Sequence, residues 1–445
     1  MTATALALKV ALGAALLGAS AGLIGTFAVL RRQALLGDML AHAALPGICL
    51  AFLLTGLRDP LVLSLGALGT GLVGVMALAL ARRWTRTRED AAMGVVLSSF
   101  FGVGVLLLTV IQKNPTGSQA GLDSYLFGEI ASLQNRDVLL LGVLAAGLVV
   151  LFFVSRKELT LLCFDDGFAR SQGWPTVLMD FLVMASVAVV TVLGLPICGV
   201  VLIAAMLIYP CAAARFWTNR LGAVAVLACL IGAVAGGAGV LIASPIVSAE
   251  STLGALLRNQ SGSLPPPGPM IVLCGAVLFG FSTLFAPERG LVARVWRNHR
   301  LQRKVQREHL LRSLYELTEK QGPPTREISP AELATRYRAE PWAESWTLAR
   351  AERRGLIDRN AESVRLTPSG AVEAARVTRV HRLWELYLVR HADIAADHVD
   401  RDADDVEHLL PPELIDRLEA DMTREYPSSA APEVNVPPSP HEIET

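Results

Sequence analysis

The chain has 445 residues, of which 52% are hydrophobic and 18% charged, and 40 Lys and Arg residues balance 40 Asp and Glu residues. A mean hydropathy of +0.45 and long apolar runs exclude an ordinary soluble enzyme and indicate a polytopic membrane protein. The zero net charge hides a division, because charged residues are sparse up to Pro287 and dense beyond it. We therefore expect two parts that face different solvents.

Apolar segments long enough to cross a bilayer fall near residues 5–30, 35–57, 61–81, 91–111, 137–154, 177–194, 222–243 and 269–286. The stretch 196–214 is ambiguous, because Gly194-Leu195-Pro196 should interrupt a helix and leave either a short ninth span or a broken continuation. Arginines flank the segments. If all of them face the cytoplasm, the positive-inside rule favours an odd count, with the N-terminus outside and the C-terminal domain inside.

Two ionisable residues, Asp38 and His42, lie inside the second apolar segment, four residues apart and therefore on one helix face. Ionisable groups at membrane depth cost at least about 2.5 kcal/mol each, so such residues usually line a polar path or bind something. A carboxylate and an imidazole one turn apart are two potential metal ligands on one rigid element. The alternative is that Asp38 caps the helix N-terminus and His42 bonds a backbone carbonyl.

A second informative stretch runs from Leu207 to Leu221. A proline follows an apolar helix there, and a short amphipathic stretch with Arg215 and Arg220 comes next. This segment should leave the bilayer and lie at its cytoplasmic face. The alternative is an ordinary interfacial loop.

Beyond a basic connector, the pattern predicts an amphipathic helix from His309 to Lys320 and a second helix from Pro330 to Tyr337, with Ser329 as its N-cap. A third helix from Pro341 to Arg354 should end at Gly355. Residues 356–358 and 364–367 then form a small hairpin. Three helices and a hairpin are typical of a winged helix-turn-helix.

Potential metal ligands recur at one-turn spacing in the last third of the chain. A long helix from Gly370 to Arg390 carries His381 and Glu385, and the acidic stretch that follows carries Asp404, Glu407 and His408. On a helix the last three could reach one cation. The tail after Tyr426 is rich in Pro and Ser, and we expect it to be disordered.

The pattern GD-x-x-x-H-A-x-L-PG, directly after an Arg-Arg turn, resembles the ABC-3 permeases, the manganese, zinc and iron family of ABC importers. The resemblance covers most of residues 10–290. It implies that Asp38 and His42 contribute to a metal site in the translocation path. It also implies that the region around Leu207 to Leu221 is the coupling helix that docks on the ATP-binding subunit, through Pro210, Ala213, Arg215 and Arg220. The sequence contains no G-x-x-x-x-G-K-[ST] motif. We therefore expect that this chain is not an enzyme and that a separate polypeptide hydrolyses ATP.

The C-terminal part resembles the DtxR/MntR family of metal-dependent repressors across roughly 305–425. The resemblance implies primary ligands at His309, His381, Asp404, Glu407 and His408 and ancillary ligands at Glu385 and Asp400. A carboxylate at Asp404 favours Mn²⁺ or Fe²⁺ over softer ions. The acidic Glu340 and Glu344, at positions that would face DNA, leave DNA binding open, and a metal-free interaction domain is an alternative.

These observations predict an all-α polytopic membrane domain with eight or nine transmembrane helices, followed by a winged helix-turn-helix and a helical metal-binding and dimerisation domain. The predicted boundaries are a permease at 1–290, a basic connector at 291–307, a winged helix at 308–370, a metal-binding domain at 371–426 and a tail at 427–445.

The predicted protein is the permease subunit of a plasma-membrane importer for Mn²⁺ or Fe²⁺, and a cytoplasmic metal-sensing domain throttles its uptake. Its partners would be an ABC ATP-binding subunit, an extracytoplasmic metal-binding protein and a second permease copy, identical or different. The alternatives are a zinc importer, and a bifunctional permease whose C-terminal half represses transcription by binding DNA.

Overall fold

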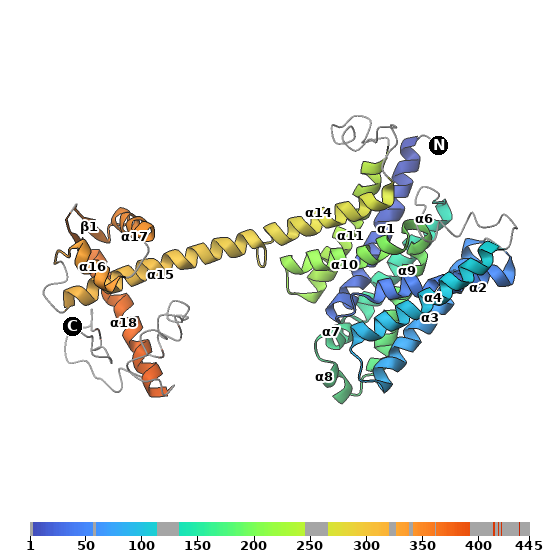
Figure 1. Ribbon diagram of the computed structural model, residues 1–445, viewed down its shortest axis with the longest axis horizontal. Helices are drawn as coiled ribbons and strands as arrows, with labels where there is room; N and C mark the ends of the chain where they lie inside the picture. Colours follow the sequence, from blue (N-terminus) through green and yellow to red (C-terminus); the bar gives the residue numbers. More distant parts are fainter. Residues whose placement is uncertain are drawn as a thin grey trace. The chain divides into compact units, whose positions relative to one another are not determined.

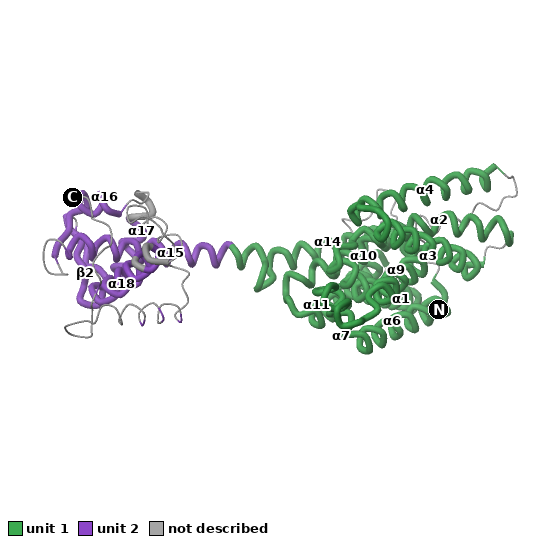
Figure 2. Tube along the Cα trace, turned by 90° about the horizontal axis from the view of Figure 1, so that it is seen from below, with its two compact units in different colours: residues 1–294 green, residues 295–445 purple. Residues whose placement is uncertain are grey.

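The computed structural model describes residues 3–56, 59–113, 133–244, 266–319, 326–337, 341–360 and 362–391, together with residues 413, 417, 420 and 436. The chain forms two compact units, residues 1–294 and residues 295–445 (Figure 2). Each unit is described by itself below.

The first unit is entirely helical in its described part. Its helices are α1 (Ala3–Leu30), α2 (Leu36–Thr55), α3 (Pro60–Trp84), α4 (Glu89–Lys113), α6 (Asn135–Val154), α7 (Arg156–Phe164), α8 (Asp166–Ser171), α9 (Thr176–Cys198), α10 (Val200–Trp217), α11 (Leu221–Ala243) and α14 (Pro267–Phe285). Among the described helices, α1, α2, α3, α4, α6, α9, α11 and α14 are long and apolar enough to cross a membrane, and α10 contains a shorter apolar helix.

Helix α1 packs against α11 along a seam of small residues (Figure 1). A Cβ added at Gly18 would lie 2.1 Å from the carbonyl oxygen of Gly232, and one added at Gly236 would lie 2.2 Å from the carbonyl oxygen of Ala14. Helices in a membrane approach this closely only where both backbones carry small side chains. The glycines therefore fix the spacing of the two helices.

A charged network gathers four helix ends at one face of this unit. Arg31 Nη2 lies 2.9 Å from Asp180 Oδ1, and Arg82 Nη1 lies 2.8 Å from Asp180 Oδ2. Arg82 Nη2 also lies 2.7 Å from Glu89 Oε1. The ends of α1 and α3 and the beginnings of α4 and α9 therefore meet at one membrane face, which is the cytoplasmic one by the positive-inside rule.

The predicted break at Gly194-Leu195-Pro196 is wrong in its position. Pro196 lies inside α9, which ends at Cys198, and the chain turns at Gly199 with a φ of +79°. Glycine adopts a positive φ at little energetic cost, so the chain can turn at Gly199. A proline inside a membrane helix is tolerated because neighbouring groups satisfy the backbone polar groups that it leaves without a hydrogen bond. The glycine, and not the proline, ends the helix.

Helix α10 lies beside α14 along much of its length. A Cβ added at Gly268 would contact Leu202, one added at Gly275 would contact Tyr209, and the ring centroids of Phe216 and Phe279 are 6.0 Å apart. From residue 268 to residue 279 a helix rises about 17 Å. We infer that α10 is a ninth crossing, which puts the N-terminus outside and the chain beyond α14 in the cytoplasm.

The predicted end of the apolar helix at Pro210 is also wrong. Helix α10 continues through Pro210 to Trp217, and Cys211 and Ala214 are fully buried. Packing against α1, α11 and α14 covers this part of the helix on several sides, and that overrides the proline's tendency to end it. A separate amphipathic helix after Pro210 is therefore absent from the described chain.

The second unit combines helices with one small hairpin. Its elements are α15 (Leu291–Glu319), which begins in the first unit, α16 (Pro330–Arg336), α17 (Pro341–Arg353), β1 (Ile357–Arg359), β2 (Val364–Leu366) and α18 (Pro368–His391). The predicted N-cap is confirmed, because the Glu332 backbone N–H donates to Ser329 Oγ at 3.2 Å. Gly355, with a φ of +68°, follows α17, and the two strands pair antiparallel.

The core of this unit lies where α15, α16, α17, the hairpin and α18 meet. Its fully buried side chains include Leu310, Leu311, Leu314, Ile328, Leu333, Ile357 and Leu366. The basic connector is the first part of α15 and continues without a break into the helix that carries Leu310. The elements follow the predicted order, and their assignment to a winged helix-turn-helix stays a prediction.

Candidate metal pathway and regulatory site

Asp38 and His42 are the two partly exposed residues in an otherwise buried stretch of α2. From Leu36 to Cys49, every residue except these two is buried. The side chain of Asp38 is 39% exposed and that of His42 is 25% exposed. The sequence pattern therefore predicted correctly that the two side chains share one face, and the structure adds that this face is open.

The geometry of the pair favours a polar site over a helix cap. His42 Nε2 lies 3.6 Å from Asp38 Oδ1, and the His42 ring meets the Phe101 ring of α4 edge to face, with centroids 4.8 Å apart. The N-cap position of α2, Leu35, receives no side-chain cap. Asp38 faces His42 instead, so the capping alternative lacks support in the described structure.

A carboxylate oxygen and an imidazole nitrogen at this separation can share one divalent ion. The part of the chain that the structure describes contains no group of three or more His, Cys, Asp and Glu residues that could hold a metal. The described pair would supply two ligands to such an ion.

The four predicted coupling residues divide into two pairs. Pro210 and Ala213 are buried inside the bundle, whereas Arg215 and Arg220 are exposed at the end of α10 and the start of α11. Between the arginines, Asn219 Nδ2 donates a hydrogen bond to Glu288 Oε2 at 3.1 Å. The turn from α10 to α11 is therefore tied to the segment that leads into α15.

Of the predicted regulatory ligands, the described chain contains His309, His381 and Glu385. Asp400, Asp404, Glu407 and His408 lie outside the described residues. His309 is half-buried on α15, and His381 and Glu385 are buried on α18. His381 Nε2 lies 3.0 Å from Glu385 Oε1, so the predicted one-turn pair on α18 is present.

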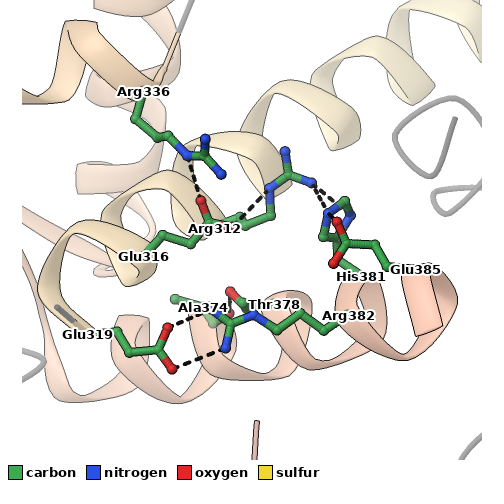
Figure 3. Close-up of polar contacts among 9 residues, drawn as sticks. All are labelled: Arg312, Glu316, Glu319, Arg336, Ala374, Thr378, His381, Arg382 and Glu385. Carbon is green, nitrogen blue, oxygen red and sulfur yellow. Dashed lines mark hydrogen bonds and ion pairs between the residues drawn. The ribbon is translucent and has the colours of Figure 1, made fainter. Parts of the chain in front are cut away.

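A buried arginine faces this pair, and sequence reasoning missed it. Arg312 Nη1, from α15, lies 2.7 Å from His381 Nδ1 and 2.9 Å from His381 Nε2 (Figure 3). The side chain of Arg312 is 9% exposed. The sequence contained one signal for Arg312: it follows His309 by three residues and therefore lies on the same helix face.

The arginine belongs to a wider charged network between α15, α16 and α18 (Figure 3). Glu316 lies between two cations, with Oε1 3.7 Å from Arg312 Nε and Oε2 accepting from Arg336 Nε at 2.7 Å. Arg382 Nη1 donates to Glu319 Oε1 at 3.1 Å. Burial opposes the charge of Arg382, but the bonds to Glu319 outweigh it and raise the pKa of the guanidinium. The network holds α18 against α15.

The described residues, as they are arranged, do not fit a metal at His381. A guanidinium nitrogen lies within hydrogen-bond distance of both imidazole nitrogens, and a metal ligand needs a free nitrogen lone pair. Arginine is permanently charged and repels a cation. A metal could use His381 only after Arg312 had moved.

A basic pocket of about 660 Å³ lies elsewhere in the second unit, between α15 and α17. Seven of its fourteen lining residues are Arg or Lys, and none is Asp or Glu. The guanidinium carbons of Arg303 and Arg350 lie 4.9 and 5.3 Å from the centroid of the Trp346 ring. Desolvation and the neighbouring cations Arg354 and Arg303 lower the pKa of Arg350. This pocket suits an anion.

Comparisons with known proteins agree with both halves of the chain. The model of the ABC 3 transport family matches residues 4–286. The model of the iron dependent repressor, metal binding and dimerisation domain, matches residues 367–425.

Relatives and a solved structure extend the agreement. The manganese transport system membrane protein MntC of Bacillus subtilis is 37% identical over 407 residues, which cover 91% of this chain and 89% of that protein. The zinc transport system membrane protein TroC of Treponema pallidum is 41% identical over 295 residues, 66% of this chain and 93% of that protein. The structure of PsaBC from Streptococcus pneumoniae in complex with Fab matches 63% of this chain and 92% of its own, with 30% identity and a TM-score of 0.50.

Proposed function

This chain belongs to the ABC 3 transport family, and we propose that it carries Mn²⁺ or Fe²⁺ past Asp38 and His42. As a permease of that family it is a multi-pass protein of the inner membrane, with its C-terminal part in the cytoplasm. It works with an ATP-binding subunit that hydrolyses ATP and with a substrate-binding protein. The chain itself is a transport subunit and not an enzyme.

The observation that carries the pathway proposal is the opening at Asp38 and His42 in a buried helix. An ionisable pair at membrane depth is costly unless it meets water, a charge or a passing ion. The second permease copy, identical or different, would close this face and complete the ion's ligand shell. Arg215 and Arg220 are the exposed residues that we assign to docking of the ATP-binding subunit.

The second part of the proposal is the identity of the transported metal ion. One relative is named for manganese and another for zinc, and a carboxylate beside a single imidazole is compatible with Mn²⁺, Fe²⁺ and Zn²⁺. We favour Mn²⁺ or Fe²⁺, because the resemblance to metal-dependent repressors places a carboxylate, Asp404, among the predicted primary regulatory ligands.

The test of the cargo is ATP-driven uptake by the complete transporter, reconstituted in proteoliposomes with its ATP-binding subunit and binding protein. Radioactive Mn²⁺ is supplied with increasing unlabelled Fe²⁺ or Zn²⁺. The proposal expects Mn²⁺ uptake that Fe²⁺ reduces at lower concentrations than Zn²⁺ does. Uptake of Zn²⁺ with exclusion of Mn²⁺ would favour the zinc importer.

For the C-terminal part we propose that it senses cytoplasmic metal, dimerises and throttles uptake. The match to a metal-binding and dimerisation domain supports this role. His381 and Glu385 are its described candidate ligands, and Asp404, Glu407 and His408 would complete the set.

A second candidate function is contact with DNA, and the basic pocket is the observation that favours it. Cations that neutralise phosphates make DNA binding fall steeply with salt. We expect salt-dependent binding of the importer's promoter DNA that weakens in Arg350→Gln. The control is Arg353→Gln, at an exposed arginine that does not line the pocket. Equal loss in both variants would count against the pocket.

A further inference from the structure

We propose that the first part of α15, residues 291–300, binds the headgroup layer of anionic phospholipids on the cytoplasmic side of the membrane. Such binding would hold the start of this helix at the lipid surface without any metal or nucleic acid. Its basis is the exposure, the charge and the place in the chain of this part of α15.

An apolar stripe runs along the first two turns of α15. It consists of Leu291, Val292, Val295 and Trp296, whose spacing places them on one face of the helix. The four side chains are between 48% and 64% exposed, so the described part of the chain leaves this face uncovered. Apolar residues exposed singly need no explanation, but a contiguous exposed stripe marks an interaction surface.

The rest of this part of the helix surface is basic. Residues 291–307 contain six Arg and Lys residues and no Asp or Glu: Arg294, Arg297, Arg300, Arg303, Lys304 and Arg307. The first three of these are all exposed. A cluster of about four to eight Lys and Arg residues just cytoplasmic of a membrane span attracts anionic lipids. A helix with Trp and Leu on one face and arginines on the other is typical of segments that bind at the lipid interface.

Trp296 and Arg300 connect the apolar stripe with the basic surface. The guanidinium carbon of Arg300 lies 5.8 Å from the centroid of the Trp296 ring. Indole rings concentrate at the level of the headgroups, and arginine can keep its stem in apolar surroundings while its charge meets a phosphate. This pair therefore offers a phospholipid an apolar and a charged contact at one place.

The stripe begins close to the last membrane span. Five residues separate Phe285, the last residue of α14, from Leu291, the first residue of α15. Within them the Gly290 backbone N–H donates to the Ala286 carbonyl oxygen at 2.9 Å, so the connection is a turn. It spans less than the roughly 20 Å that an extended chain of this length could reach. The start of the stripe therefore stays within reach of the cytoplasmic headgroups.

The combination of both surfaces favours a lipid over other ligands. A soluble anion or DNA would use the cations and leave the apolar stripe in water. An apolar protein surface would cover the stripe and leave the cations without a counter-charge. An anionic membrane surface offers phosphates to the arginines and acyl chains to Val295 and Trp296 at the same time.

The test is quenching of tryptophan fluorescence by brominated lipids, with the full-length protein in nanodiscs. The discs contain equal amounts of phosphatidylcholine and phosphatidylglycerol, with bromine on the acyl chains of one lipid or of the other. The difference between a protein and its Trp296→Phe variant isolates the signal of Trp296. We expect brominated phosphatidylglycerol to quench this signal at least about twofold more than brominated phosphatidylcholine, and this preference to shrink at high salt.

Paired variants assign the preference to the arginines. The double variant Arg297→Gln and Arg300→Gln should lose it, whereas Arg297→Lys and Arg300→Lys should keep it, because lysine retains the charge. The matched control, Arg353→Gln and Arg359→Gln, removes two exposed arginines elsewhere in the second unit and should behave like the wild type. Each protein is compared with its own Trp296→Phe variant.

Several results would overturn the proposal. Equal quenching by the two brominated lipids in the wild type would exclude a preference for anionic lipid. Quenching by neither lipid would show that Trp296 does not meet acyl chains. If the ring became shielded from aqueous iodide only after the ATP-binding subunit was added, the stripe would belong to that protein. Loss of the preference in the control double variant would assign it to the overall charge and not to this segment.

Discussion

At the residue scale, the sequence reveals a functional side chain only where it contrasts with its surroundings. Asp38 and His42 stand out because the segment around them is apolar, and the structure keeps both on one open face. Arg312 does not stand out, because α15 contains many arginines. Only the tertiary fold brings it to His381, 69 residues away. Rules based on residue spacing within one helix do not predict contacts between residues far apart in the sequence.

The burial of an ion pair predicts how much the pair contributes to stability. Asp180→Asn leaves Arg31 and Arg82 without their shared partner, whose side chain is only 18% exposed. Removing one partner of a buried ion pair costs about 3–5 kcal/mol, so we expect a loss of about 2–3 kcal/mol at this partly buried site. The measurement is thermal unfolding of the purified protein in detergent.

The control for that measurement is Asp166→Asn. Asp166 pairs with Arg170 at the surface, where the two side chains are 39% and 67% exposed. Exposed pairs contribute less than about 1 kcal/mol. Similar melting temperatures for the two variants would contradict the structural importance of Asp180.

At the element scale, periodicity and caps predict helices well, whereas helix ends depend on packing. The Ser329 cap and the Gly355 stop follow from local chemistry and are confirmed. Pro196 and Pro210 were expected to end helices and do not, because neighbouring helices compensate for the proline. The actual break at Gly199 depends on a positive φ that composition alone does not reveal.

The seam between α1 and α11 yields a prediction about packing. In Gly18→Ala the new Cβ meets the carbonyl oxygen of Gly232, a backbone atom that cannot rotate away. Overpacking of this kind costs about 1–3 kcal/mol, so the yield and melting temperature of the purified protein should both fall. In Gly102→Ala the new Cβ meets no described atom within 4 Å. A wild-type result for both variants would show that the seam can widen.

The hydrogen bond from Asn219 to Glu288 predicts how regulation reaches transport. In Asn219→Ala, uptake at low cytoplasmic Mn²⁺ should stay near the wild-type rate, whereas the reduction caused by high cytoplasmic Mn²⁺ should shrink at least threefold. The measurement is initial uptake by proteoliposomes loaded with or without Mn²⁺. Asn135→Ala, at an exposed asparagine at the start of α6, is the control. Unchanged inhibition in Asn219→Ala would exclude this contact from the regulatory route.

At the scale of the whole molecule, the change in charge density near Pro287 reflects the passage from the last membrane helix to α15. Helix α14 ends at Phe285 and α15 begins at Leu291. The sequence could not decide between eight and nine crossings, because α10 is short and contains Pro210. Its packing beside α14 favours nine.

Nine crossings predict opposite locations for the two termini. An epitope tag at the N-terminus should bind antibody in intact cells whose outer layers have been removed, and a tag at the C-terminus should bind only after permeabilisation. Protection of both tags in intact cells would indicate an even number of crossings and would exclude α10 as a span.

The central claim, that the metal passes Asp38 and His42, is tested most directly by ATP-driven Mn²⁺ uptake in the reconstituted transporter. We predict that Asp38→Asn and His42→Gln each lower the initial rate at least tenfold. Asp90→Asn and His299→Gln, at exposed positions outside the pathway, should transport like the wild type. Wild-type uptake in Asp38→Asn and His42→Gln, with all four variants equally abundant and folded, would contradict the claim.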